Sequence, residues 1–598
     1  MKAIQDLYAT RAEEFANTSL SHRQRYHFFS FVRLIIFILA LGMAIVLGTW
    51  HWWAGLAFFM VFLAFFYRFV RWHSDIARKQ AHAANLADIN RKELNALAYH
   101  LDDFAFDPPR ADVMHPYAAD LDIEGAHALF QLLNRASTGI GRAALSDFLC
   151  YPADLPEILA RQEAIRELSP QVGWRQELQA LGKEAADDPA HVAGLRQWLE
   201  APNIFAEIRW LTAARVVIPL WTLVAAIFVA PVIPWTLNLL LLLPAGYILQ
   251  KTVRRVNQTH ELTGKAGTIL HHYAAMIAHL ESADFRSAAL QKAQLPLRSE
   301  DKQASEALKT LAYITSQLDV RYNAFAVLLN LGFLWDIQWL YRLEQWKSKY
   351  GIHLSEWFDS LKYVEAISSL ANAAYNNPDW VFPEIIDACK LEAVHLGHPL
   401  IAPGIRVCND FQLPSSGHIK LITGSNMAGK STFLRTVGIN IVLAMAGAPV
   451  CATRFRCPLL MPYTSMRTRD ALHENTSSFY AELKRLKFII EAVEAKGSGG
   501  HYPFFILDEI LKGTNSEDRH TGSRALIKQL IAAGGTGLIA THDLELGKLE
   551  AEYGGALENL CMEVTIEDGK LSFDYKIKKG ISKSFNATLL MREMGIRI

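Results

Sequence analysis

The chain has 598 residues, which is enough for several domains, and 51% of them are hydrophobic. Its 60 Lys and Arg residues balance 60 Asp and Glu residues, so the formal net charge is zero. This balance excludes the chain-wide basic surplus that many duplex-DNA-binding proteins carry, although a local basic patch stays open. The six cysteines are scattered without metal-type spacing, which favours reduced cytosolic thiols.

The first predicted element is an apolar run from Leu34 to Tyr67 that contains no Asp, Glu, Lys or Arg. One helical crossing of a membrane takes about 20 residues, so this length predicts a hairpin of two helices (about 34–67) within an N-terminal region, 1–117. The Trp-rich segment 49–53 marks its centre, and Trp favours the membrane interface. No cleaved signal peptide is expected, because the run starts too late.

A polar amphipathic helix is predicted over 74–105, and Pro108, Pro109 and Pro116 then indicate a linker. Segments 120–200 and 256–375 have apolar residues at helical spacing and are predicted to form long helices of a helical domain, 118–375.

A second uncharged run, Val216–Leu249, interrupts that domain and predicts a second hairpin at about 213–250. Basic residues flank both runs: Arg23, Arg25 and Arg33 precede the first, Arg68 and Arg71 follow it, Arg209 and Arg215 precede the second, and Lys251, Arg254 and Arg255 follow it. The positive-inside rule then predicts a multi-pass protein of the inner membrane whose soluble domains are cytoplasmic. Shallow insertion into one leaflet, or burial of both runs in a soluble core, remain alternatives.

The segment from Gly424 to Thr432 fits G-x-x-x-x-G-K-[ST], the phosphate-binding loop. A predicted strand (419–423) precedes it and an apolar helix (433–446) follows, so backbone N–H groups and the helix N-terminus can hold phosphate. Lys430 would reach the β- and γ-phosphates, and the Ser431 hydroxyl would bind Mg²⁺. A turn without a ligand is the alternative. The predicted nucleotide-binding residues are Gly424, Ser425, Asn426, Met427, Ala428, Gly429, Lys430, Ser431 and Thr432.

Two further strand ends carry polar residues. Asp508 and Glu509 follow the apolar residues 504–507, and we expect Asp508 to bind the metal and Glu509 to act as the general base. An acidic N-cap of the next helix is the alternative. His542 follows a predicted strand, 537–541, and could contact the γ-phosphate as a catalytic residue, although a lone His is usually structural.

These motifs resemble a known family. TGSNMAGKSTFLR, LDEILKGTNSEDR and ATHDLEL look like the ATPase motifs of MutS, the DNA mismatch-repair ATPases of the ABC superfamily. The LSGGQ signature of ABC transporters is absent, which favours MutS. Further similar segments are 397–400, 407–410, 477–482 and 575–580, with looser similarity at 129–141 and 161–165.

The resemblance implies a C-terminal α/β P-loop (ABC-type) ATPase domain over 376–598 that uses ATP and Mg²⁺, and a helical core and lever domain before it. It also implies a homodimer through the ATPase domains, in which Ser477 and Ser478 of each chain cap the partner's γ-phosphate. Asn515 would lie in the crossing loop after the acidic pair.

The chain differs from this family in the two segments that would contact DNA. Residues 1–117 contain no Phe-x-Glu wedge, and the second hairpin stands where a DNA-gripping clamp is expected. We therefore predict a membrane-anchored MutS-like ATPase that is associated with DNA but not selective for mismatches. Alternatives are an ABC-type mechanochemical membrane ATPase and a nucleotide-switched scaffold, neither with a DNA role.

Overall fold

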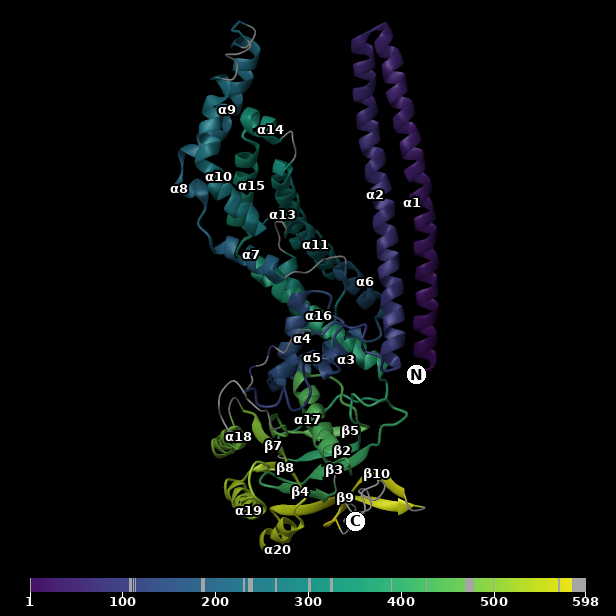
Figure 1. The fold of residues 1–598 in the computed structure, drawn as a ribbon, viewed down its shortest axis with the longest axis vertical. Coiled ribbons are helices and arrows are strands. Elements are labelled where there is room, and N and C mark those ends of the chain that lie inside the picture. The colour runs from purple at the N-terminus through teal and green to yellow at the C-terminus, as the bar shows by residue number, and fades with distance from the viewer. Residues whose placement is uncertain are drawn as a thin grey trace.

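The computed structural model is mostly helical, with an α/β region at its C-terminal end, as the predicted fold class requires (Figure 1). The α/β region lies at one end of the long axis, and the tips of two helical arms lie at the other. The structure describes residues 2–582 except 107–109, 111, 113, 184–188, 230–231, 235–239, 264–265, 299–302, 323–325, 389, 426, 468–477, 498–499 and 568–569.

The first arm is a hairpin of two long helices, α1 (Lys2–Trp50) and α2 (Trp52–Leu97), which reverse at His51. The predicted turn at the Trp-rich centre is therefore confirmed. The helices extend well beyond the apolar run, however, and the helix expected at 74–105 is the continuation of α2 and ends earlier, at Leu97. No proline occurs before Pro108, so nothing in the sequence interrupts either helix. Phe37 of α1 packs against Phe66 of α2, with ring centroids 5.3 Å apart.

The helical region after the linker is built mainly from shorter helices than expected. The prediction of long helices over 120–200 is wrong, because Thr138 and Asp154 cap the N-termini of two separate helices there. The elements are α3 (Leu129–Leu133), α4 (Gly139–Cys150), α5 (Leu155–Leu168), α6 (Val172–Lys183), α7 (Pro189–Glu200), α8 (Ile204–Glu207), α11 (Ala266–Ser282), α12 (Ala288–Gln294), η3 (Leu295–Leu297), α13 (Ala304–Leu318), η4 (Asp319–Tyr322), α14 (Ala326–Phe333), α15 (Trp335–Tyr350) and α16 (Leu354–Asn376).

The second arm contains α9 (Trp210–Val224), a π-helical turn η1 (Ala225–Val229) and α10 (Leu243–Thr263). The indole N–H of Trp221 donates to the carbonyl of Leu241 at 3.2 Å, which joins the two sides of this arm. Residues 230–231 and 235–239, near the middle of the predicted second hairpin, lie outside the described residues. Among the described residues, α1, α2 and the helix from Trp210 to Val229 are long and apolar enough to cross a membrane, by length and composition.

The main sheet has six strands in the order β10-β9-β4-β8-β7-β6, parallel except for the β10–β9 pair. Its strands are β4 (Ile419–Gly424), β6 (Leu460–Ser465), β7 (Tyr502–Asp508), β8 (Thr536–Thr541), β9 (Leu557–Glu567) and β10 (Lys570–Lys579). The second sheet, β1-β5-β2-β3, contains β1 (Glu384–Ile385), β2 (Leu391–Leu396), β3 (Asn409–Leu413) and β5 (Arg454–Cys457). The remaining elements are α17 (Lys430–Ala446), α18 (Ser478–Glu494), α19 (Ser516–Ala532), η5 (Leu544–Lys548) and α20 (Leu549–Tyr553).

One hydrophobic core runs from the helical region into the α/β region, because α17 packs against α4 and α5. Arg161 of α5 donates to the carbonyl of Ala446 at the end of α17. The phosphate-loop helix thus contacts the helical region directly.

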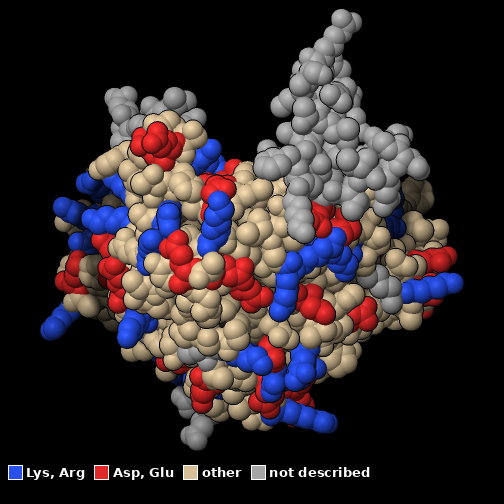
Figure 2. All heavy atoms as spheres, turned by 90° about the horizontal axis from the view of Figure 1, so that it is seen from below, with Lys and Arg blue, Asp and Glu red and all other residues tan. Residues whose placement is uncertain are grey.

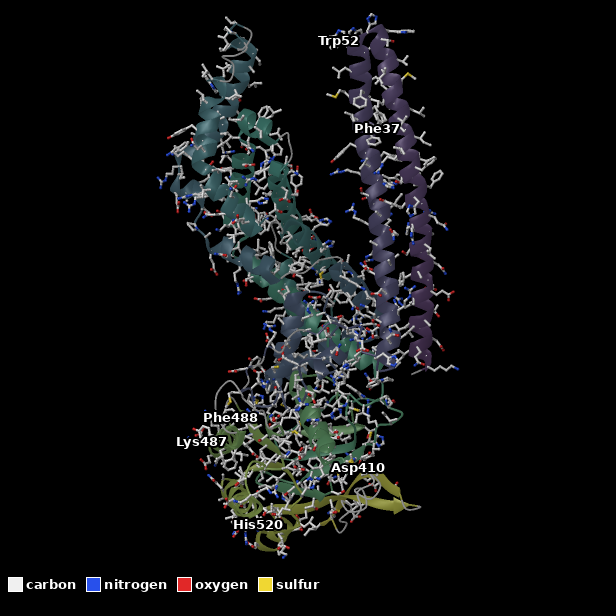
Figure 3. The ribbon with its side chains drawn as sticks, in the orientation of Figure 1. Phe37, Trp52, Asp410, Lys487, Phe488 and His520 are labelled. Atoms are coloured by element: carbon white, nitrogen blue, oxygen red, sulfur yellow. The ribbon has the colours of Figure 1, made fainter. Side chains whose placement is uncertain are left out.

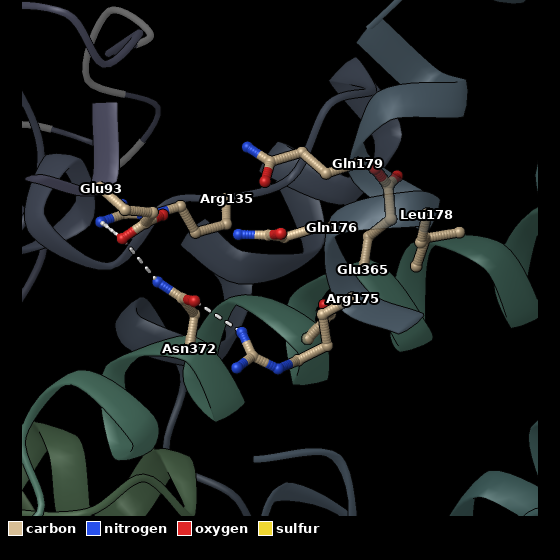
Figure 4. A pocket seen from close by; sticks show the side chains of 9 residues that line it. Glu93, Arg135, Arg175, Gln176, Leu178, Gln179, Glu365 and Asn372 are labelled. Atoms are coloured by element: carbon tan, nitrogen blue, oxygen red, sulfur yellow. Dashed lines mark hydrogen bonds and ion pairs between the residues drawn. The ribbon is translucent and has the colours of Figure 1, made fainter. Parts of the chain in front are cut away.

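A buried polar network ties the foot of the first arm to the helical region (Figure 4). Glu93 of α2 pairs with Arg135 and also accepts hydrogen bonds from Asn372 and Asn376 of α16. The Arg135 guanidinium holds the pKa of the Glu93 carboxyl below its usual range, against the effect of burial. The space between these side chains is only about 10 Å³, too little for a ligand, so the network is a structural joint.

Candidate functional site

The candidate site lies where adjacent parallel strands end. β4, β8 and β7 are neighbours in the sheet, and their carboxyl ends deliver Gly424, His542 and the Asp508–Glu509 pair to one edge. In open α/β sheets this edge is the usual ligand site. The structure therefore brings together three motifs that are spread over more than a hundred residues of the sequence.

The loop between β4 and α17 has a conformation that requires glycine. Gly424 has φ +156° and Gly429 has φ +95°, and a Cβ on Gly429 would lie 2.9 Å from the Tyr575 ring. The buried Lys430 ammonium donates to the carbonyls of Gly424 and Ser425, at 2.8 and 2.9 Å. Burial lowers the pKa of Lys430 to about 8, although Glu509 and Asp508 oppose the shift. A cation is thus held at the N-terminus of an apolar helix.

Glu509 is strained and ion-paired. Its φ is +53°, unusual for a residue with a side chain, and strain of this kind concentrates at functional sites. Its carboxylate pairs with Nε2 of His542 and lies 3.4 Å from the Lys512 ammonium. The hydrogen bond from His542, opposed by desolvation, is the largest cause that lowers the pKa of Glu509 to about 2. His542 also approaches Lys430 through Nδ1 at 3.3 Å.

Near the phosphate loop, Oδ1 of Asp508 and Oγ of Ser425 are buried and lack a hydrogen-bond partner among the described residues. Buried carboxylate and hydroxyl oxygens need a partner, and both are oxygen ligands of the type that Mg²⁺ prefers. The site therefore fits a magnesium–phosphate group. Ser431, the other predicted metal ligand, is half-buried in the first turn of α17, and Thr432 beside it is exposed.

A cavity of about 510 Å³ opens beside the loop. Its lining is mostly apolar, with Ile405 and Val407 on one segment, Met427 and Phe433 around the loop, and Tyr575 on β10. The volume suits a small-molecule ligand whose phosphates lie on the loop.

Two features of the site were not foreseen from the sequence. Glu482 accepts a hydrogen bond from the backbone N–H of Leu511 at 2.5 Å, and burial raises the pKa of its carboxyl. It thereby fixes the turn after Glu509. The only signal was its place in the segment 477–482. Arg485 donates to the carbonyl of His115 at 2.9 Å, which ties α18 to the linker before the helical region.

Not every predicted site residue can be placed. Asn426 and Ser477 lie outside the described residues, and Ser478 begins α18 but its side chain is also outside them. Asn515 is exposed and caps α19, where its side chain accepts from the N–H of Asp518. The predicted role of this turn at a partner's site stays a prediction. In the described part of the chain, no cluster of three or more His, Cys, Asp or Glu could hold a metal alone.

Comparison with known proteins identifies this region. Residues 420–590 match the model of MutS domain V. The chain is 34% identical over 224 residues to a DNA mismatch repair protein MutS of Aquifex pyrophilus, covering 37% of this chain and 25% of that protein. It is 30% identical over 239 residues to the MutS of Persephonella marina, covering 39% of this chain and 26% of that protein.

A mouse protein, MutS protein homolog 4, is 28% identical over 246 residues, covering 39% of this chain and 24% of that protein. The chain thus spans about a quarter of the length of the relatives it matches. The similarity lies in the C-terminal part of the chain, which carries the phosphate loop and the acidic pair. Residues 420–590 of the chain therefore carry a MutS domain V, and this region is what the chain shares with the MutS relatives.

Proposed function

We propose that the chain binds ATP with Mg²⁺ and hydrolyses it. The observation that carries the proposal is the convergence of Lys430, Asp508, Glu509 and His542 at one sheet edge, with a buried carboxylate oxygen left unpartnered. Bound Mg²⁺ would neutralise charge on the phosphates.

The residues have separate roles in this proposal. The loop N–H groups and Lys430 bind the phosphates, Asp508 and Ser431 hold the metal, and the 510 Å³ cavity takes the nucleoside. Glu509 positions a water and accepts its proton at a carboxylate oxygen. His542 holds Glu509 ionised and in place through their ion pair.

The test is ATP binding and turnover by Glu509→Gln. Binding should survive, because the loop is untouched, and turnover should fall by about 10²- to 10⁴-fold, the usual contribution of a general base. Lys512→Gln is the matched control, since Lys512 also contacts this carboxylate but is exposed and carries no assigned role. Wild-type turnover by Glu509→Gln would refute the assignment of the base.

We further propose that the two arms anchor the protein in the inner membrane. The apolar tips of both arms point to the same end of the molecule, where Figure 3 shows Phe37 and Trp52 far from the α/β region. Exposed apolar side chains cover both: Ile38, Leu39, Ile45, Trp50 and Phe65 on the first, and Val216, Val217, Leu220 and Phe228 on the second. Exposure on this scale is unusual for a water-soluble surface. Whether the arms cross fully or enter one leaflet stays open.

Basic flanks place the soluble parts in the cytoplasm in this proposal. Single cysteines at Ser21, Asp122 and Ile598 should be shielded from a membrane-impermeant reagent in intact cells and labelled after lysis. External labelling at any one of them would refute the topology of two cytoplasm-facing hairpins.

In the same proposal the chain has three parts: 1–117 with the first arm, 118–375 with the second arm, and the ATPase domain 376–598. Two ATPase domains would pair as a homodimer around ATP.

The MutS relatives motivate an association with DNA that is not mismatch-selective. The exposed apolar arms favour a second candidate, an ATPase that moves membrane-embedded helices and has no DNA role. ATPase assays of detergent-solubilised protein with added DNA or added lipid separate the two, since each predicts stimulation by one ligand.

A further inference from the structure

A short apolar helix beside the second arm is left exposed. The stretch 322–335 contains no Asp, Glu, Lys or Arg, and α14 (Ala326–Phe333) forms its middle. Val327, Leu328 and Phe333 are 63%, 66% and 52% exposed. Burial of one such side chain is worth about 1.5–3 kcal/mol, so three exposed together indicate a surface that is covered in the working protein.

The position of α14 is fixed by packing. It packs against α9 and α10, and the Thr222 hydroxyl of α9 donates to the carbonyl of Gly332 at 2.5 Å. Ala326 and Leu334 at its two ends are buried. Its exposed side is therefore held next to the apolar surface of α9, which is formed by Val216, Val217, Leu220, Trp221, Leu223 and Val224.

The charged groups that flank the two uncharged stretches contact other side chains. Arg321 and Asp336, which flank the uncharged stretch, lie 3.7 Å apart. Arg215, before the apolar part of α9, stacks on the ring of Tyr341 at 3.7 Å. In the shared view of Figures 1 and 3, α14 lies at about the same level along the long axis as Phe37 of the first arm.

We propose that α14 inserts among the acyl chains of the bilayer as a further membrane-contacting element beside the second arm. The proposal rests on the membrane anchoring proposed above. Acyl chains are the fitting occupant, because α14 packs against α9, the exposed side chains of both helices are apolar, and α14 offers no charge for a protein partner to recognise. Eight residues span only about 12 Å, so α14 would enter the bilayer without crossing it.

The test uses single cysteines that carry an environment-sensitive fluorophore, in protein reconstituted into phosphatidylcholine vesicles with brominated acyl chains. Leu328→Cys reports on α14. Leu220→Cys, 59% exposed on α9, reports on the proposed anchor, and Ile352→Cys, 83% exposed between α15 and α16, is the aqueous control. Labelling of the unsubstituted protein corrects for the native cysteines.

We expect bromine to quench the probes at 328 and 220 several-fold more than the probe at 352. Quenching at 220 but not at 328 would overturn the insertion of α14 and leave the anchoring intact. Absence of quenching at both 220 and 328 would overturn both proposals. An unquenched probe at 328 whose emission shifts to the blue with rising protein concentration would identify a face between two copies of the chain, and would also overturn insertion.

Discussion

The α/β end and the arm end of the molecule differ in backbone conformation and in the kind of side chain that they expose. At the α/β end, polar groups converge and the backbone is strained: Met427, Glu509 and Leu511 all have positive φ. At the arm end α1 and α2 are long regular helices, and the exposed side chains of both arms are largely apolar. Figure 2, which views the molecule from the α/β side, shows acidic and basic residues interspersed on that face. The contrast supports the proposal that ATP turnover and membrane attachment reside in separable regions, so a substitution at one end should leave the other intact.

The first arm is nevertheless linked to the α/β region at its base, through the segment that follows α2. Arg406 donates to the Tyr99 hydroxyl at 2.6 Å, and this hydroxyl lies 3.3 Å from the carbonyl of Pro399. Ile405, next to Arg406, lines the cavity beside the phosphate loop. The segment after α2 therefore contacts the loop that shapes the proposed nucleotide site.

The largest effect is expected from a substitution that removes the Glu93–Arg135 ion pair at the base of the first arm. Glu93→Ala leaves the buried Arg135 guanidinium without its carboxylate, and such a change costs about 3–5 kcal/mol. The N-terminal part of α1 and the C-terminal part of α2 should become accessible to protease and hydrogen exchange, while ATP turnover persists. Asp88→Ala on the same helix, α2, is the matched control, because the pair of Asp88 with Lys183 of α6 is only half-buried and is worth about 1 kcal/mol at most. Equal effects of the two variants would contradict a structural joint.

The second prediction concerns a substitution that strains the phosphate loop in the α/β region and leaves the arms unchanged. Gly429→Ala places a Cβ at φ +95° and against Tyr575. Strain of about 1–3 kcal/mol corresponds to a roughly 5- to 150-fold weaker affinity for ATP, measured by titration calorimetry. Gly42→Ala in α1, where a Cβ meets nothing within 4 Å, should leave the affinity unchanged. A similar loss in both variants would mean that the ends are not separable.

The third prediction concerns pH. Burial lowers the pKa of Lys430 to about 8, so the free protein loses this cation as the pH rises through about 8. Phosphate binding restores the charge, because the protonated form holds the ligand. Affinity for a non-hydrolysable ATP analogue should therefore be constant below pH 7.5 and fall by up to about tenfold per unit above pH 8. A flat profile to pH 10 would show that Lys430 stays protonated in the free protein.

The fourth prediction probes the contact between the ends. Tyr99→Phe removes a hydroxyl that accepts from Arg406, and one hydrogen bond of this kind contributes about 0.5–1.5 kcal/mol. The affinity for ATP should change by about two- to tenfold if the contact shapes the cavity. Tyr313→Phe, at an exposed ring in α13, is the control. An unchanged affinity in Tyr99→Phe would confine the contact to a structural role.

The sequence predicted the candidate site better than the arms. The positions of Gly424, Lys430, Asp508 and Glu509 follow from local motifs at strand ends, so the edge of the sheet was predictable once the strands were found. The packing that positions them was not, since Glu482 and Tyr575 act from elements distant in sequence. Composition predicted that both arms are apolar hairpins, but it did not predict the full length of α1 and α2. It also did not single out α14, because its eight residues are too few for a helix that spans a membrane.

The smallest effect is expected for the preference between mismatched and matched duplex DNA. A mismatch reader inserts an aromatic wedge at an unstacked base step and holds the duplex bent. Residues 1–117 contain no Phe-x-Glu motif, and most of their described part forms the first arm, while the second arm stands where a clamp is expected. Competition binding of a G·T mismatch against its matched parent at one salt concentration should show no preference. Any affinity through surface Lys and Arg should fade as salt rises. A preference above about tenfold, roughly 1.4 kcal/mol, would mean that an arm reads DNA and that the separation of the two ends is wrong.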